Sequence, residues 1–166
     1  LKGELATELL FEIAAQLFDF RALAADDDAR PGRGKDKPNL AAEAFNLDLR
    51  DARAVQELLH EGADLVIGHH PHVLEGIEEY IGKYICYSLG NFCFGGNSTP
   101  SDTDSMIVQQ TFTFNKKGKL TKSSKLNIIP CSISSSSGYN DYCPVPLTGD
   151  AKQRVLDKIS QYSEGL

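Results

Sequence analysis

The chain has 166 residues, of which 41% are hydrophobic and 24% are charged, a composition typical of a soluble globular protein with a core of its own. No apolar run approaches the roughly 20 residues that a membrane-spanning helix needs. The net charge of -6 argues against nucleic acid or an anionic membrane as the main partner, because both are bound chiefly through Lys and Arg.

The first 48 residues divide into two segments. Apolar residues recur every four positions from Leu5 to Leu17 with acidic residues among them, which predicts an amphipathic helix over residues 1–23 and not a signal peptide. Residues 24–48 combine dense charge with prolines and glycines, so we expect a charged linker, poorly ordered over residues 24–38. No secretory address or membrane anchor is visible.

The next elements alternate between helix and strand. Residues 49–61 predict a helix, with Asp51 and Gly62 as start and stop signals. The run "ADLVIG" that follows is typical of a strand buried on both faces. "GIEEYI" and "KYICYSL" then predict a hairpin. This order favours an α/β layer.

The last third predicts a second hairpin and a closing helix. Residues 105–115 and 118–130 have the β-branched and aromatic content of strands, joined by a turn at Gly118. The basic stretch around that turn is interpreted as a solvated hairpin. Residues 131–149 have the composition of a loop, and a helix is expected from Asp150, its possible N-cap, to residue 163.

The four cysteines show no C-x-x-C spacing, which makes a structural zinc site an unfavoured interpretation. Cys86 and Cys93 lie in apolar segments, where buried thiols are common. Cys131 and Cys143 flank a serine-rich loop, and spacing alone leaves open whether they pair.

The stretch "VIGHHPHV", residues 66–73, holds three of the four histidines at the end of an apolar run. In an extended segment, residues two apart project to the same side, so His70 and His72 would point together and His69 away from them. Neutral imidazole is a good ligand for Zn, Mn, Fe or Ni. The alternative is that these histidines are ordinary polar loop residues that cap backbone groups.

A catalytic metal centre usually needs three or more protein ligands, so two imidazoles require further donors. Asp102, Asp104 and the run of aspartates at 26–28 are the candidates in this chain. The alternative for each of them is a solvated turn carboxylate.

Residues 62–92, "GADLVIGHHPHVLEGIEEYIGKYICYSLGNF", resemble the signature of the CapA family, the bacterial poly-γ-glutamate capsule biosynthesis proteins. The likeness extends from about residue 49 to the closing helix. It implies an α/β (α+β) fold of the calcineurin-like metallophosphoesterase type, in which two mixed sheets pack face to face with helices outside.

The resemblance also implies a site. The family's H-x-H motif supplies metal ligands, which corresponds to His70 and His72 here, with Gly68 giving the turn and a divalent Mn, Zn or Fe ion as cofactor. His69 is expected near the site without being a ligand. Ser88 and Asn91 belong to the family's second marker, "SLGN", and are expected beside the site.

The superfamily's other ligand motifs, D-x-H, G-D-x-x-D and G-N-H-D or G-N-H-E, do not occur in this sequence. Gly149-Asp150 is followed by Gln153, and Gly90-Asn91 by Phe92. Residues 49–166 therefore resemble the C-terminal part of such a domain, and residues 1–48 do not resemble the rest. We expect little or no phosphoesterase activity from this chain alone.

Two functions stay open. The chain is either a CapA-type capsule biosynthesis protein carrying the H-x-H half of a hydrolase-like metal site, or a non-catalytic cell-surface module that assists assembly or export of an acidic polymer. The resemblance implies the outer face of the cytoplasmic membrane as location. It implies an acidic polymer or a phosphoester as substrate and other capsule biosynthesis proteins as partners, while the net charge argues against nucleic acid.

Overall fold

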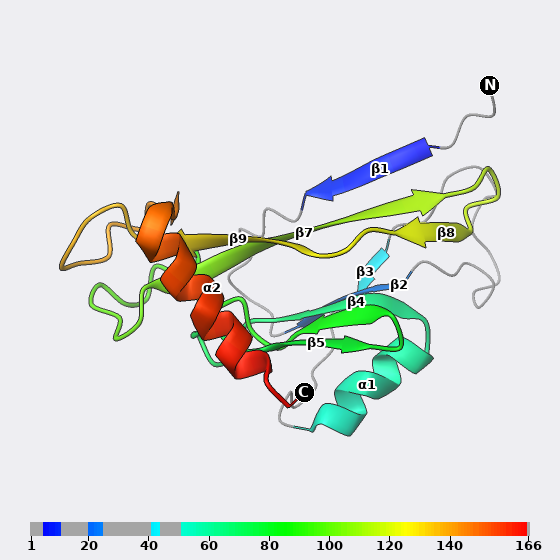
Figure 1. Cartoon of the computed structure of the whole chain (residues 1–166), viewed down its shortest axis with the longest axis horizontal. Coiled ribbons are helices and arrows are strands. Elements are labelled where there is room, and N and C mark those ends of the chain that lie inside the picture. Colours follow the sequence, from blue (N-terminus) through cyan, green and yellow to red (C-terminus); the bar gives the residue numbers. More distant parts are fainter. Residues whose placement is uncertain (1–4, 11–19, 25–40, 44–50, 166) are drawn as a thin grey trace.

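The computed structural model describes residues 5–10, 20–24, 41–43 and 51–165, with side chains in the last of these ranges (Figure 1). Its elements, in chain order, are β1 (Leu5–Leu10), β2 (Phe20–Ala24), β3 (Ala41–Glu43), α1 (Ala52–His60), β4 (Ala63–Gly68), β5 (Ile77–Tyr80), β6 (Lys83–Cys86), β7 (Asp104–Phe114), β8 (Leu120–Ser123), β9 (Asn127–Ser132), β10 (Val145–Pro146) and α2 (Gly149–Ser163).

The strands form two sheets of five. One has the order β3-β2-β4-β6-β5 and is mixed, because β4 and β6 run parallel while its other pairs are antiparallel. The other has the order β1-β7-β9-β10, with β8 also paired to β7, and its described pairs are antiparallel. The predicted class, a partial α+β sandwich, is confirmed.

The main core lies between the two sheets and under α2 (Figure 1). β4 contributes Leu65 and Ile67, β7 contributes Phe112, and α2 contributes Val155 and Ile159, all of them buried. β4 is buried on both faces, as predicted, because its alternate residues pack against α1 on the other side. The order of layers is therefore α1, mixed sheet, antiparallel sheet, with α2 contacting strands of both sheets.

The helices begin for different local reasons. The Asp51 carboxylate accepts hydrogen bonds from the backbone N–H groups of Arg53 (3.1 Å) and Ala54 (3.2 Å), which confirms Asp51 as the start signal of α1. Asp150, in contrast, is not the N-cap of α2. The helix already begins at Gly149, and Asp150 lies in its first turn, where a carboxylate is favoured by the helix dipole.

The predicted N-terminal helix is wrong where residues 1–23 are described. Leu5–Leu10 forms β1 along β7, and Phe20–Ala24 forms β2 along β4. Hydrogen bonding to strands distant in the sequence outweighs the local helical periodicity. Of the predicted linker, Ala24 ends β2 and Ala41–Glu43 forms β3, while its other residues lie outside the described part of the chain, as does most of the segment expected to be poorly ordered.

The strand predicted over residues 118–130 is divided into β8 and β9. Between them, the Ser124 hydroxyl accepts from the Thr111 N–H (2.9 Å) and donates to the Lys125 carbonyl (2.9 Å). The Ser124 hydroxyl thus accepts a hydrogen bond that a backbone carbonyl would accept in a regular pair of strands, and the strand is interrupted there. The hairpin prediction itself is confirmed, since β7 and β8 pair antiparallel.

Candidate functional site

The two loops that carry the candidate residues meet at one edge of the mixed sheet. Because β4 and β6 are parallel neighbours, their carboxyl ends lie side by side, and residues 69–73 follow one while residues 87–91 follow the other. The Leu89 N–H donates to the Gly68 carbonyl (2.9 Å), and the Glu75 N–H donates to the Ser88 carbonyl (3.1 Å). The carboxyl edge of an open α/β sheet is the usual place for ligands.

The histidine segment forms a turn and is not extended. The His72 N–H donates to the His69 carbonyl (3.0 Å), and His72 has a left-handed backbone with φ of 60°. The alternation expected for His69, His70 and His72 therefore does not apply, because Pro71 lies inside a reversal of the chain. Gly68 is the last residue of β4, and the turn begins after it. A non-glycine residue with positive φ is costly and typical of functional sites.

His72 is oriented by the loop after β6. Its Nδ1 atom lies 2.8 Å from Asn91 Oδ1, and because this oxygen can only accept, Nδ1 carries the proton. The ring also packs on Phe94, with a centroid distance of 4.8 Å and an interplanar angle of 48°. In the neutral form of the ring, this leaves the lone pair on Nε2. Both His70 and His72 are solvent exposed.

His69 also faces the loop after β6. Its Nδ1 donates to the Gly90 carbonyl across 3.2 Å, and its side chain is half-buried. The structure thus brings His69 and His72, from one loop, into contact with Gly90 and Asn91 from the other. His60, interpreted from sequence as a surface or boundary residue, lies on α1, where it is exposed and hydrogen-bonded to Tyr80.

The loop after β6 is hydrogen-bonded to the start of β7. Ser105, at the start of β7, donates its hydroxyl toward the carbonyls of Leu89 (3.0 Å) and Asn91. Ser88 accepts from the Gly90 N–H (3.1 Å) and is buried. Gly90 has φ of 75°, a backbone conformation that favours glycine, and a Cβ there would make a tight contact of 3.1 Å with the Asp104 carbonyl oxygen.

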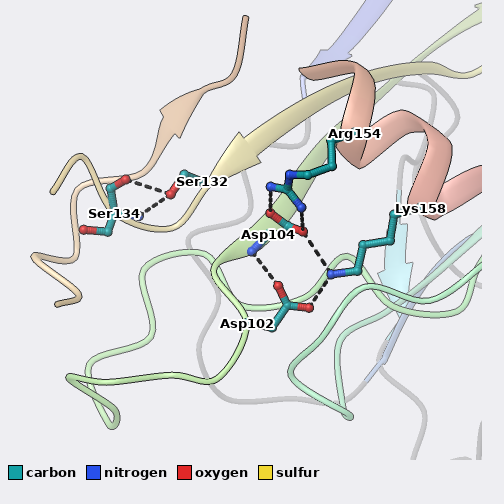
Figure 2. A network of polar contacts seen from close by, with 6 residues as sticks. All are labelled: Asp102, Asp104, Ser132, Ser134, Arg154 and Lys158. Carbon is teal, nitrogen blue, oxygen red and sulfur yellow. Dashed lines mark hydrogen bonds and ion pairs between the residues drawn. The ribbon is translucent and has the colours of Figure 1, made fainter. Parts of the chain in front are cut away.

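Asp102 and Asp104 bind basic side chains of α2 (Figure 2). Asp104 forms a two-pronged ion pair with Arg154 of α2, at 2.6 and 2.7 Å, and also bonds Lys158 at 2.9 Å. Lys158 is shared with Asp102 at 2.5 Å. We name these four residues the α2 ion cluster. The two aspartates are two residues apart, just before and at the start of β7, and the two basic residues are four apart on α2, a spacing that is visible in the sequence.

The α2 ion cluster favours the charged form of Asp104. Burial by itself raises the pKa of this carboxyl, but the hydrogen bonds and charges of Arg154 and Lys158 outweigh it and hold the pKa below its ordinary value. The pKa of Lys158 is raised in turn, because its bonds to the two carboxylates outweigh its burial. Both aspartates therefore bind side chains of α2 and fix the position of this helix.

Two further loops, one containing Asn97 and Ser98 and the other containing Asn140, are hydrogen-bonded to each other. The buried Asn140 donates from its backbone N–H to Ser98 (2.8 Å) and from its side chain to the carbonyl of Asn97 (3.1 Å). Asp141 accepts from Ser134, Ser135 and Ser136 and from the Cys143 N–H, and these bonds hold its pKa low. The serine-rich segment predicted as a loop is thus ordered around one carboxylate.

No group of three or more His, Cys, Asp or Glu side chains that could hold a metal ion occurs in the described ranges. Cys131 and Cys143 do not form a disulfide with each other. Cys131 is buried and Cys143 exposed. Cys93, expected to be buried, is also exposed, because it lies in the loop and not in a strand.

Fold and site together define a two-sheet α/β sandwich with a histidine turn at the carboxyl edge of its mixed sheet. Residues 44–96 match the family model for the bacterial capsule synthesis protein PGA_cap. Over this stretch, and over the longer matches described next, the chain is similar to the CapA family.

Two curated relatives match most of the chain. The PGA biosynthesis protein CapA of Bacillus subtilis (strain 168) is 44% identical over 108 residues, which are 64% of this chain and 25% of that protein. The capsule biosynthesis protein CapA of Bacillus anthracis is 32% identical over 115 residues, 69% of this chain and 24% of that protein. The matched part thus spans about a quarter of either relative.

A shorter likeness, 47% identity over 49 residues, relates 30% of the chain to 11% of the uncharacterized protein y4sH of Sinorhizobium fredii. No solved structure matches the chain. Within the described residues, no helix has the length and apolar character that crossing a membrane requires.

Proposed function

We propose that this chain acts in the biosynthesis of a poly-γ-glutamate capsule at the cell surface, and that its working site is the edge where β4 and β6 end. The observation that carries the proposal is the 44% identity over 108 residues to a protein named for this process. The likeness includes the family-model match over residues 44–96, which contains both site loops.

We further propose that His70 and His72 contribute imidazole ligands to a divalent metal ion, Mn, Zn or Fe. The support is the bond from His72 Nδ1 to Asn91 Oδ1 (2.8 Å), because ligating histidines typically donate their second ring nitrogen to a neighbouring oxygen. This arrangement leaves Nε2 of His72 to bind the ion. The described residues supply these donors without a third ligand nearby, so completion of the site requires donors from elsewhere.

A bound divalent ion would supply Lewis-acid polarisation of a phosphoryl or carbonyl oxygen. The residues of this chain would orient that site. Asn91 fixes the tautomer of His72, Phe94 limits rotation of its ring, and Ser105 holds the backbone that positions Asn91. An acidic polymer or a phosphoester is the substrate class that we propose, with other capsule biosynthesis proteins as partners.

The test is a chimera of the Bacillus subtilis relative in which the matched segment is replaced by that of this chain. We expect γ-linked polyglutamate to be made by the chimera and lost when it carries His70→Ala and His72→Ala. His60→Ala, an exposed histidine on α1, is the matched control and should leave production unchanged. Absence of polymer from a stably expressed chimera contradicts the function, and full production by the double variant contradicts the metal role and favours a non-catalytic module.

A further inference from the structure

Charge is divided unevenly along this acidic protein. Residues 105–140 contain five lysines and no aspartate or glutamate. The other 130 residues hold all 23 acidic residues and 12 of the 17 basic ones, a net charge of -11. We name the lysine-bearing segment the basic hairpin; its members are Lys116, Lys117, Lys119, Lys122 and Lys125.

The five side chains of the basic hairpin are exposed to solvent. Among the residues that the structure describes, no carboxylate forms an ion pair with any of them. Lys83, Arg154 and Lys158, in contrast, are paired with aspartates. The basic hairpin is therefore a concentration of positive charge that the fold itself does not use.

The backbone beneath these lysines is fixed. Asn115 Oδ1 accepts from the N–H groups of Lys117 (2.8 Å) and Lys119 (3.1 Å), and the Asn115 backbone pairs with Lys119 and Gly118. Gly118 has φ of 81°, as the reversal requires. Lys117 and Lys119 thus project from a hydrogen-bonded turn, which lowers the entropic cost of holding both of them on one ligand.

The basic hairpin projects from one end of the sandwich (Figure 1). β8 lies on one side of β7 and β1 on the other, since Phe112 pairs with both Ser123 and Thr7, so the acidic residue of β1, Glu8, lies across β7 from β8. β7 has 11 residues and begins beside the site loops, so the hairpin lies about 35 Å from that end.

We propose that the basic hairpin binds the carboxylates of an acidic polymer, poly-γ-glutamate. This inference rests on the proposed function and deepens it by naming the surface that contacts the polymer. One exposed lysine–carboxylate pair is weak, so useful affinity requires several pairs at once, which a repeating polyanion supplies and a small anion does not. A long polymer can also reach the distant site edge, whereas a small molecule cannot occupy both.

A lipid surface fits this patch less well. Helices and loops that lie on membranes combine basic residues with apolar ones that insert. The large hydrophobic side chains exposed in the described part of the chain are Ile81, Tyr139, Tyr142 and Tyr162, and none of them belongs to the basic hairpin. Single-stranded nucleic acid fits less well for a similar reason, because it is bound on aromatic stacking platforms and none of these exposed tyrosines lies in the basic hairpin.

The experiment measures binding of the 166-residue chain to immobilised poly-γ-glutamate at low and high salt. Lys117→Gln with Lys119→Gln should weaken binding at low salt about fivefold or more, and should flatten its salt dependence. The matched control is Arg53→Gln with Lys152→Gln, two exposed cations on α1 and α2, which removes the same charge and should leave affinity nearly unchanged. Anionic lipid vesicles and duplex DNA serve as competing probes.

Equal weakening in the two variants, no binding by the parent chain, or tighter binding to vesicles or DNA than to the polymer would each overturn the proposal. The chimera described above separates this result from the proposed function. Polymer production by the chimera together with unaltered binding in the lysine variant rejects the basic hairpin alone. Binding lost in the lysine variant and kept in the control supports the hairpin whether or not the chimera produces polymer.

Discussion

At the scale of single residues, the site depends on the contact between His72 and Asn91. The left-handed backbone of His72 and the packing of Phe94 on its ring leave the imidazole few orientations, and Asn91 selects the tautomer. A positive φ at a non-glycine residue costs conformational energy, so the surrounding contacts must hold His72 in this conformation.

Asn91→Ala removes the acceptor for His72 Nδ1, so the ring can turn and change tautomer. We expect the affinity for Mn or Zn to fall about 10- to 100-fold, measured by titration calorimetry. Asn97→Ala is the control, because Asn97 lies in the same loop and its side chain accepts only from Thr99 in the described structure. Equal affinities of the Asn91 variant and the parent would refute the positioning role.

Sequence reasoning reached some of these residues and missed others. The histidines and the "SLGN" turn stand out because of their types and spacing, so their proximity could be expected. Phe94 and Ser105 could not be identified as partners, because nothing local indicates which loop atoms a hydroxyl or a ring will meet. The direction of His69 also depends on a turn at Pro71 that the extended-strand assumption excludes.

At the scale of elements, α2 is fixed to the start of β7 by the α2 ion cluster. Asp104 has a side-chain exposure of only 5%, and both of its oxygens are bonded to cations from the helix. A buried carboxylate with these partners resists substitution, because removal of its charge leaves donors without acceptors.

Asp104→Asn should lower the free energy of unfolding by about 2 kcal/mol at neutral pH, measured by urea denaturation. The pKa of Asp104 is lowered in the folded state, so its contribution is complete above the ordinary value near 4 and is lost as the pH falls through the folded pKa. The difference between parent and variant should therefore be constant near neutrality and shrink in acid.

Asp157→Asn provides the comparison for this variant. Asp157 lies on α2 but is exposed, and within the described residues it accepts only from Gln153. We expect a change within about 0.5 kcal/mol. A similar loss in both variants, or a gap between the Asp104 variant and the parent that widens as the pH falls, would contradict the assigned role of the ion cluster.

Elements with strong local signals were predictable, and those made by distant pairing were not. α1 has its cap at Asp51, and β4 is a short apolar run between glycines. β1 forms by pairing with the edge of β7, which is more than 90 residues away in the chain. The local sequence pattern of residues 5–10 contains no information about that distant strand. The same applies to the interruption at Ser124, which depends on Thr111.

At the scale of the whole molecule, one core joins both sheets and α2. Phe112 of β7 is 2% exposed and is among the largest buried side chains. Because the two sheets and the helix share this core, we expect them to unfold together, as a single cooperative unit.

Phe112→Ala should lower the free energy of unfolding by about 3–5 kcal/mol, because it leaves a cavity that the packed sheets cannot close. Urea unfolding monitored by amide exchange should show β4 and β9, one strand from each sheet, shifting together. Ile81→Ala, at a side chain that is 54% exposed, should change little. Loss of protection in β9 with β4 unaffected would show that the sheets are independent.

The central claim is that the histidine turn binds a divalent metal ion. Equilibrium dialysis of the chain against Mn and Zn, with bound metal measured by elemental analysis, tests it most directly. The parent and the His60→Ala variant should hold equal amounts of metal, and the His70→Ala, His72→Ala double variant should hold markedly less at the same free concentration. Equal metal in the parent and the double variant would contradict the proposed site.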